Sequence, residues 1–349
     1  MQYWASGITT PRWSLYSAQD IAFVLTEMGR GASYAGASAS VRERAGRFPA
    51  GPGGSRYTRH GQLAADLVEV FAPVVFEPQA PTRWPAGTLV LDQIPFRVRG
   101  THPNGAPKPG GSVAFNVFGA LGYDEAGRGF LWRLEAFHTA SGDDWEAFLR
   151  ALPGAPKRVV CDAHDGIGVG VRRVFPAADI YYCEWHLREK LRLRLTRARA
   201  NTPAELAWRR LEQACHSDHG WEQFKAAVFR RRPRLDEVRR WIDRWDTTIC
   251  AQFERRPTET ERELGMVVTT GGLETRFQRV QTVLQPRRFA LGNRERLNRL
   301  LGLLQLELND QAHAPTYSRH IRAWLEERGG YAPRRRAIAD TAGTKSLRV

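Results

Sequence analysis

The chain has 349 residues, a formal net charge of +15 and a sequence pI near 10.3. This length leaves room for two or three domains, and the charge favours a nucleic-acid partner because a basic surface attracts phosphate groups. The chain has no apolar run long enough to span a bilayer, no signal peptide and no dense cysteine pattern. We therefore expect a protein of a reducing compartment, cytoplasmic and, in a bacterium, on the nucleoid, with no membrane partner.

Two short helices separated by a glycine-containing turn are predicted within residues 1–50, at about 18–28 and 34–45. Ser17 and Ser33 precede them as N-caps. Such a pair suits a helix-turn-helix whose second helix enters the DNA major groove, with Arg42 and Arg44 as candidate DNA contacts. A helical hairpin that only packs on the core is the alternative.

A linker and a connecting helix are expected over residues 51–84. The stretch from Gly46 to Ser55 is rich in proline and glycine, as linkers between domains often are. The apolar pattern that follows predicts a helix from about Gly61 to Phe71. We expect this helix to lead into the next domain, at residues 85–310.

That domain begins with a series of strands. The patterns predict strands at 88–98, 113–122 and 129–137, a helix at 144–152, a strand at 158–162, a helix from Gly166 to Pro176 and a strand at 180–183. This order predicts an α/β fold with a mixed sheet. Asp92 lies within the first strand and Asp162 ends the fourth, and a charge in an apolar strand needs a partner or a metal. The loop at 100–111 is expected to be mobile.

An α-helical insertion is expected at about residues 187–267. Its tryptophans have broadly helical spacing, and most are expected to pack in the core of a helical bundle: Trp208, Trp221, Trp241 and Trp245. One of them, or the basic cluster of Arg230, Arg231 and Arg232, is a candidate for contacting DNA. The alternative for the cluster is a solvated helix end.

An amphipathic helix is predicted after Thr269-Thr-Gly-Gly272, with Glu274 in its first turn. Arg276 and Arg279 follow it as candidate DNA contacts. Leucines at 297, 300, 301, 304 and 308 predict a later helix that covers the sheet or joins protomers. Residues 311–349 are expected to form a C-terminal helix and a basic, disordered tail from about Gly329.

Four motifs follow one another: Asp162-Ala-His-Asp-Gly166, Phe175-Pro176, Tyr182-Cys-Glu-Trp-His-Leu187 and Thr269-Thr-Gly-Gly-Leu-Glu274. Their order and spacing resemble the Mutator-like (MULE) group of DDE transposases, including bacterial insertion-sequence relatives, over about residues 85–310. The resemblance implies an RNase H-like catalytic domain in which Asp92, Asp162 and Glu274 match the three metal-binding acids. Cys183 and His186 match a Cys-x-x-His motif near the site. Bacterial members usually carry Asn-Asn or Asn-Gly before the last Glu, where this chain has Gly271-Gly272.

Three acids suit the two-metal cleavage of a phosphodiester, which needs two hard cations about 3.5 to 4 Å apart. Because Mg²⁺ prefers oxygen ligands, we expect two Mg²⁺ or Mn²⁺ ions, with Asp92 bridging them and Asp162 and Glu274 each completing one. We do not expect zinc. Cys183 and His186 could bind it only together with a second group, such as Cys215, His216 and His219. We expect instead that His186 lies near the active site with Cys183 packed beneath it.

Each acid also has an ordinary structural interpretation. Asp92 could end a strand at the surface, and Glu274 could only stabilise the N-terminus of its helix. His164 and Asp165 could be the functional pair in place of Asp162, or Asp165 could cap the helix that starts at Gly166.

The sequence therefore predicts a DNA transposase that cleaves and joins the ends of its own element in a metal-dependent reaction. Its expected partners are the terminal inverted repeats, the target DNA and further copies of the chain, in a homodimer or a larger synaptic complex. The alternatives are a metal-dependent nuclease or resolvase that does not join DNA, and a catalytically inactive DNA-binding protein derived from a transposase. An upstream DNA-binding module missing from this chain is a further hypothesis.

Overall fold

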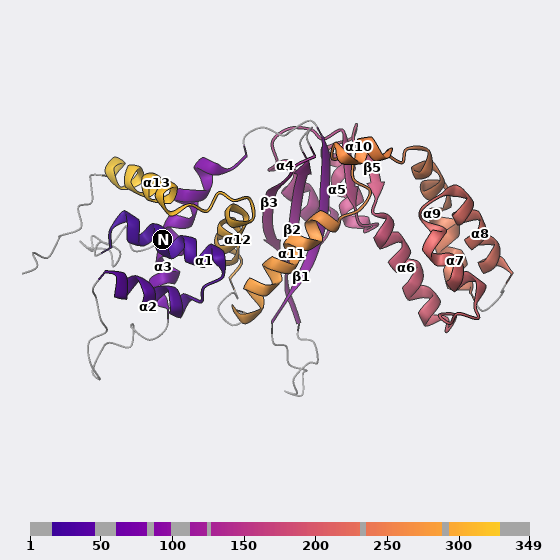
Figure 1. Ribbon diagram of the computed structural model, residues 1–349, viewed down its shortest axis with the longest axis horizontal. Coiled ribbons are helices and arrows are strands. Elements are labelled where there is room, and N and C mark those ends of the chain that lie inside the picture. The colour runs from indigo at the N-terminus through magenta and orange to yellow at the C-terminus, as the bar shows by residue number, and fades with distance from the viewer. Residues whose placement is uncertain are drawn as a thin grey trace, which may run out of the picture. The chain divides into compact units, whose positions relative to one another are not determined.

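A computed structural model describes residues 16–45, 61–81, 87–98, 112–123, 127–230, 235–287 and 293–328. The chain divides into two compact units, the first made of residues 1–78 and 312–349 and the second of residues 79–311 (Figure 1). Three of our predictions concern residues outside the described ranges: the loop at 100–111, the arginines Arg231 and Arg232, and the tail from Gly329.

The first unit is a group of helices. Its helices are α1 (Ala18–Arg30), α2 (Tyr34–Arg44), α3 (Gln62–Phe76) and α13 (Ala314–Glu327). Ser17 and Ser33 cap α1 and α2 as predicted, with their hydroxyls accepting the N–H groups of Asp20 and Gly36. Gly31 ends α1 in the left-handed conformation, at φ 106°, which glycine adopts without steric cost.

The helix α3 belongs to this first unit, whereas the sequence predicted a connecting helix that leads into the second. The N–H of Ala64 donates to Ser38 Oγ on α2 at 3.0 Å, and the ring of Phe71 packs edge-on against Trp324 of α13 at 5.4 Å. The helix α3 also continues past Phe71, where the sequence predicted its end, through Pro73 to Phe76. A proline ends many helices, but the buried side chain of Val75 extends the apolar face of this one.

The second unit contains a five-stranded mixed sheet with the order β3-β2-β1-β4-β5. Its strands are β1 (Thr88–Val98), β2 (Ser112–Tyr123), β3 (Gly129–Phe137), β4 (Arg158–Cys161) and β5 (Asp179–Tyr182). The first three strands pair antiparallel, whereas β4 pairs parallel with both β1 and β5. The predicted α/β class and the order of strands and helices are confirmed, with small shifts at the ends.

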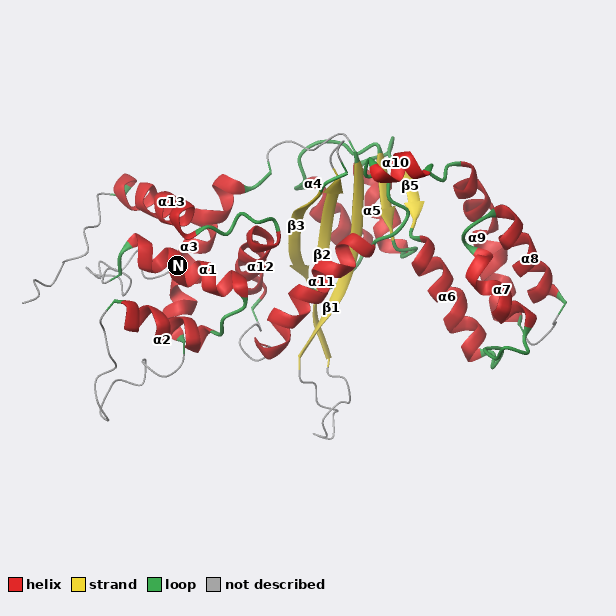
Figure 2. Ribbon diagram, viewed as in Figure 1, coloured by secondary structure: helices red, strands yellow, loops and turns green. Residues whose placement is uncertain are grey.

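Helices cover both faces of this sheet (Figure 2). On one face, Phe118 of β2 stacks on Trp145 of α4 (Gly142–Arg150) with ring centroids 4.0 Å apart, and α5 (Asp165–Val174) packs beside α4. The next residue of β2, Gly119, faces α11 (Gly271–Leu284). Because successive strand residues point to opposite faces, α11 lies on the other side of the sheet from α4.

Amide side chains satisfy the open edges of the sheet. On α12 (Arg294–Leu308), Gln305 bonds with its two amide atoms to Leu134 N at 3.1 Å and Trp132 O at 2.8 Å. The amide of Asn309 likewise accepts from Leu131 N at 2.9 Å and donates to Leu131 O at 2.8 Å. Exposed edge strands invite pairing with other chains, so these amides protect β3. The leucine-rich helix therefore covers the sheet, as one of its two interpretations predicted.

The opposite edge is protected in the same way by Gln252, whose amide accepts from Tyr182 N at 2.9 Å and donates to Tyr182 O at 2.8 Å. This glutamine belongs to the helical insertion, which begins at Glu184, three residues earlier than predicted. Its helices are α6 (Glu184–Arg197), α7 (Leu206–Ala214), α8 (Asp218–Phe229), α9 (Asp236–Glu254) and α10 (Glu259–Glu263). Short 3-10 helices occur at Glu77–Gln79 and Gln285–Arg287.

The tryptophans of the insertion pack in its core, as predicted for most of them. Trp221 is fully buried and donates from Nε1 to Asp246 at 2.6 Å, and Trp241 stacks on Trp245 at 5.9 Å. Within the part of the chain that the structure describes, no helix is long and apolar enough to cross a membrane.

Candidate active site

Strand register places Asp92 and Asp162 next to each other. The parallel pairing of β1 with β4 aligns Leu91 with Cys161, and each aspartate is the next residue along its chain. Leu91 and Cys161 both point into the core on the α4 side, so alternation turns Asp92 toward the opposite face. Asp162 follows immediately after the end of β4.

A close approach of α11 to the sheet brings Glu274 to the same place. Asp92 pairs with Gly119 across the β1–β2 ladder, and a Cβ at Gly119 would lie 2.7 Å from the ring of Phe277 and 2.9 Å from Leu273 on α11. Only glycine leaves space for this contact. Glu274 follows Leu273 in the first turn of α11, as predicted.

Gly272 shows why this chain carries glycine before the glutamate. A Cβ at this position would lie 2.2 Å from the hydroxyl of Tyr123 at the end of β2, so a larger residue would require that tyrosine to move. Gly272 thus fits the packing of α11 against β2, whereas a Cβ at Gly271 would make only an ordinary contact, 3.5 Å from Thr269 Oγ1.

Asp92 is an uncommonly buried carboxyl group, with 6% of its surface exposed. Its Oδ1 accepts the N–H of Gln93 at 2.8 Å. Burial raises its pKa from 3.8 to about 7; the Gln93 N–H works against the rise, and the nearby carboxylates of Asp162 and Glu274 add to it. Asp162, at the end of β4, and Glu274, on α11, are therefore close enough to Asp92 on β1 to disfavour its charged form.

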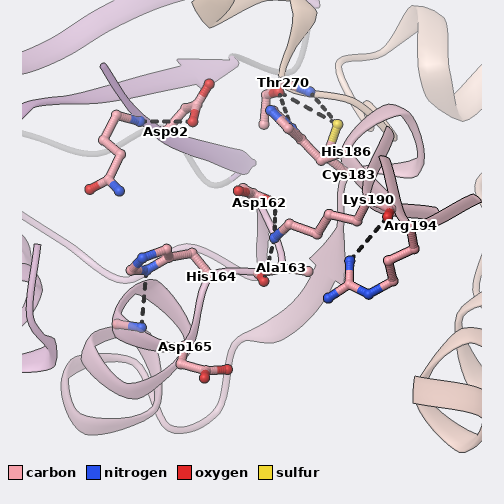
Figure 3. A network of polar contacts seen from close by, with 12 residues as sticks. Asp92, Asp162, Ala163, His164, Asp165, Cys183, His186, Lys190, Arg194 and Thr270 are labelled. Atoms are coloured by element: carbon pink, nitrogen blue, oxygen red, sulfur yellow. Dashed lines mark hydrogen bonds and ion pairs between the residues drawn. The ribbon is translucent and has the colours of Figure 1, made fainter. Parts of the chain in front are cut away.

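Lys190 supplies a positive charge to this cluster and was not predicted from the sequence. Its Nζ donates to Asp162 Oδ1 at 2.7 Å and to Ala163 O at 2.6 Å, and Figure 3 shows it reaching across from α6. The spacing carried a signal: Cys183, His186 and Lys190 are three and four residues apart, so one face of a helix presents them.

The Cys-x-x-His motif lies at the start of α6, beside the N-terminus of α11. His186 Nδ1 is 3.9 Å from Glu274 Oε1, and burial lowers the pKa of its imidazole, while Asp162 and Glu274 act in the opposite direction. Cys183 is fully buried, and its sulfur accepts the Thr270 N–H at 3.4 Å. Burial raises the pKa of the Cys183 thiol, which favours its neutral form.

The alternative pair, His164 and Asp165, is engaged elsewhere. His164 is the N-cap of α5, and its Nδ1 accepts the Gly166 N–H at 3.2 Å. Asp165 is exposed and pairs with Arg244 at 2.9 Å. His164 therefore takes the capping role that the sequence analysis considered for Asp165.

The zinc arrangement considered from the sequence is not assembled. His216 Nδ1 lies 3.3 Å from Glu184 Oε2, and His219 Nε2 lies 2.6 Å from the amide nitrogen of Gln223. Among the described residues, the clusters with metal-ligand geometry are Cys183–His186–Glu274 and Asp218–Glu222–Cys250, and neither contains Cys215, His216 or His219.

The candidate DNA-binding arginines have different surroundings. Arg276 is used within the fold, because its guanidinium donates to Gly272 O at 2.9 Å and to Gly129 O at 3.1 Å. Arg44 lies 3.3 Å from Asp20 on α1. Arg230 caps the end of α8 and Arg279 lies on α11, and both are exposed. Arg42 lies half-buried on α2.

An exposed tryptophan next to the site was also not singled out from the sequence. Trp185 is 42% exposed, and its ring packs edge-on against His186 with centroids 4.9 Å apart. An aromatic surface beside acidic metal-ligand candidates suits contact with a nucleobase.

The chain matches no protein-family model and no curated protein sequence. Among solved structures, it is similar to the Drosophila P element transposase strand transfer complex, with 9% sequence identity, 94% of this chain and 90% of that chain covered, and a TM-score of 0.30. This likeness is faint.

The three acids offer the oxygen ligands of a hard divalent cation, although the trio is not among the described clusters with metal-ligand geometry. Asp92 is nearly buried beside two further carboxylates, and the one cation bonded to the cluster in the described structure is the ammonium of Lys190. Three carboxylates facing one lysine leave negative charge uncompensated. Carboxylate oxygens are the ligands that Mg²⁺ and Mn²⁺ prefer, so the donor set suits these ions.

Proposed function

We propose that this chain is a DDE-type DNA transposase that cleaves the ends of its own element and joins them to target DNA. The observation that carries the proposal is the approach of Asp162 and Glu274 to the nearly buried Asp92 on the face of a mixed sheet that α11 covers. Such a cluster costs stability unless it serves to bind cations.

The sheet supports an RNase H-like catalytic domain within the proposal. Three antiparallel strands followed by two parallel strands with intervening helices form the opening that we expected of such a domain. The helical insertion between Asp162 and Glu274 also has its expected place. The Mutator-like assignment rests on the four sequence motifs.

The acids have distinct roles in the proposed reaction. Asp92 would hold both of two Mg²⁺ or Mn²⁺ ions, Asp162 would hold one and Glu274 the other. When bound, such ions activate the attacking oxygen and stabilise the leaving oxygen in a phosphodiester displacement. Asp92 is suited to the shared position because burial and the neighbouring carboxylates disfavour its charge without a cation.

DNA is the proposed partner, in the form of the element's terminal repeats and the target. The net charge of +15 provides general attraction to phosphate. Trp185, exposed beside His186, is a surface on which a base near the scissile phosphate could stack. We also propose that the chain acts as a homodimer or a larger synaptic complex, because two DNA ends must be joined in one event.

The function is tested by incubating the full chain and Mg²⁺ or Mn²⁺ with DNA that carries the gene's own flanking ends. We expect joined products that require both the metal and the native ends, with scrambled ends and EDTA as controls. Metal-dependent cleavage without joining would instead indicate a nuclease or resolvase. Binding without any cleavage would indicate an inactive DNA-binding derivative.

Lys190 gives a separate prediction, because its ammonium occupies Asp162 Oδ1 at 2.7 Å and a cation would share that oxygen. We expect Lys190→Met to bind Mn²⁺ about five to ten times more tightly in the absence of DNA, since about 1 kcal/mol of competing charge is removed. Lys190→Arg should stay near wild type. Titration by electron paramagnetic resonance measures this affinity.

The matched control for Lys190 is Arg192→Met, which removes a half-exposed positive charge from the same helix, paired there with Glu189. Its Mn²⁺ affinity should equal that of the wild type. Weaker Mn²⁺ binding by Lys190→Met would show that the lysine supports the metal site instead of competing for it.

A further inference from the structure

The Thr270 hydroxyl lies at the centre of the contacts around Glu274. Its Oγ1 is 2.5 Å from Glu274 Oε1, 3.3 Å from His186 Nδ1 and 3.5 Å from Cys183 Sγ. Thr270 is fully buried, and Figure 3 shows it facing the motif residues. One side chain thus connects a candidate metal ligand with both members of the Cys-x-x-His motif.

The hydrogen-bond capacity of a hydroxyl determines how these contacts are shared. A hydroxyl has one proton to donate and can accept further bonds. The contact to the Glu274 carboxylate is the shortest, and bonds to a charged acceptor are the strongest, so the proton goes there. His186 can then donate from Nδ1 to Oγ1, and Cys183 accepts the Thr270 backbone N–H.

Thr270 also does not perform the role that its position normally gives it. It is the N-cap of α11, where a threonine hydroxyl usually accepts an N–H from the first turn of its helix. Here no such side-chain bond forms. The hydroxyl instead points to Glu274 one turn ahead and to α6, so the usual capping energy, about 1 kcal/mol, is not realised.

Glu274 needs such support because it is 35% exposed and its long side chain has several rotatable bonds. The start of α6 holds Thr270 in turn: Cys183 bonds its backbone, and Glu184 N donates to Val268 O at 3.2 Å. Two helix N-termini are therefore joined at the place where the glutamate leaves α11.

From this geometry we propose that Thr270 is a positioning residue that holds Glu274 in its metal-binding orientation and transmits the support of Cys183 and His186 to it. This inference rests on the proposed function, because it assigns Glu274 to the metal centre. It gives the Cys-x-x-His motif a mechanical role: it fixes a hydroxyl and binds no ion of its own.

The test compares Thr270→Val, Thr270→Ser and the control Thr269→Val, which removes a hydroxyl from the adjacent, half-buried residue. Valine keeps the shape of threonine without the hydroxyl, and serine keeps the hydroxyl. We expect Thr270→Val to bind Mn²⁺ at least about tenfold more weakly, as is typical when a residue that orients a metal ligand is lost. The Mn²⁺ affinities of Thr270→Ser and Thr269→Val should stay within about twofold of the wild-type affinity.

A second measurement follows the contact itself without metal or DNA. At constant pH, the ¹⁵N signal of His186 Nδ1 should move in Thr270→Val and stay in place in Thr270→Ser. Wild-type affinity in Thr270→Val, or equal loss in valine and serine variants, would overturn the inference. So would stoichiometric Zn²⁺ binding that requires Cys183, His186 and Glu274 together, because the motif would then be a metal site.

These outcomes are separable from a failure of the proposed function. A wild-type protein that binds Mn²⁺ in a Thr270-dependent manner but joins no DNA would support the positioning role and contradict transposition. Normal strand transfer by the wild type, together with an unchanged Mn²⁺ affinity of Thr270→Val, would support transposition and contradict the positioning role. Wild-type protein that binds no Mn²⁺ would overturn both.

Discussion

Asp92→Asn, Asp162→Asn and Glu274→Gln should each reduce metal-dependent cleavage by about a thousandfold or more, equivalent to about 4 kcal/mol of activation free energy. The acids converge from three separate elements, and each amide removes one charge while nearly preserving shape. Because strand transfer uses the same centre, joined products should disappear with the cleaved ones. Gel assays on the flanking-end DNA measure both steps.

The controls for these variants are acids of equal chemistry outside the cluster. Asp165 lies three residues from Asp162, is exposed and pairs with Arg244. Asp165→Asn therefore removes a similar charge outside the cluster. Glu295→Gln changes an exposed glutamate on α12. Both should keep cleavage within about twofold of wild type, as surface substitutions usually do. If Asp165→Asn removed cleavage and Asp162→Asn did not, our choice between the two neighbouring aspartates would be wrong.

DNA affinity separates chemistry from binding in the same variants. None of the three substitutions removes a positive charge, so electrostatic attraction to phosphate should persist. We expect binding to the flanking ends in EDTA to be unchanged in all three. A parallel loss of binding and cleavage would indicate that these acids stabilise the fold or the DNA interface, and that they have no catalytic role.

The metal-free protein should lose stability as the pH rises from 5 to 8.5, and Asp92→Asn should remove much of this loss. Burial, with repulsion from Asp162 and Glu274, raises the pKa of Asp92 to about 7, whereas the unfolded chain has a value near 3.8. As the pH rises, Asp92 therefore loses its proton at a lower pH in the unfolded chain than in the folded protein. The neutral carboxyl contributes stability that is fully present below pH 3.8 and is lost as the pH rises through 7.

This difference in pKa corresponds to a few kcal/mol, about 4 at most. Thermal unfolding in EDTA should show Asp92→Asn close to wild type near pH 5 and several degrees more stable at pH 8.5. Mg²⁺ or Mn²⁺ should raise the wild-type Tm at pH 8.5 more than that of the variant. If the difference in Tm between Asp92→Asn and the wild type did not depend on pH, the fold would not be holding Asp92 in its neutral form.

A protein that is stabilised when a buried acid is removed has kept that acid for a purpose other than folding. The cleavage assay and the unfolding measurement on Asp92→Asn therefore both test whether Asp92 serves catalysis or the fold. Asp92→Asn should inactivate the site and stabilise the metal-free fold, whereas an ordinary structural aspartate would destabilise the fold when replaced.

Local patterns in the sequence were sufficient for the elements that carry the acids. Apolar runs around Asp92 and before Asp162 predicted their strands, and the Thr/Gly turn before Glu274 predicted its helix start, since strand and helix periodicity are properties of neighbouring residues. The N-caps Ser17 and Ser33 and the order of the strands were predicted for the same reason.

Only the tertiary structure decided which distant groups meet. Lys190 on α6 reaches Asp162, and Thr270 joins Glu274 to Cys183 and His186. The spacing of Cys183, His186 and Lys190 indicates only that they share a helix face, and it does not show which residues that face contacts. The same holds for α3 and α13, which are separated in sequence and packed in one unit. The sequence by itself marked Asp92, Asp162 and Glu274 as candidate cation ligands. The burial of Asp92 and the packing of α11 against Gly119 bring Glu274 and Asp162 close to it, because such contacts form only when the chain folds.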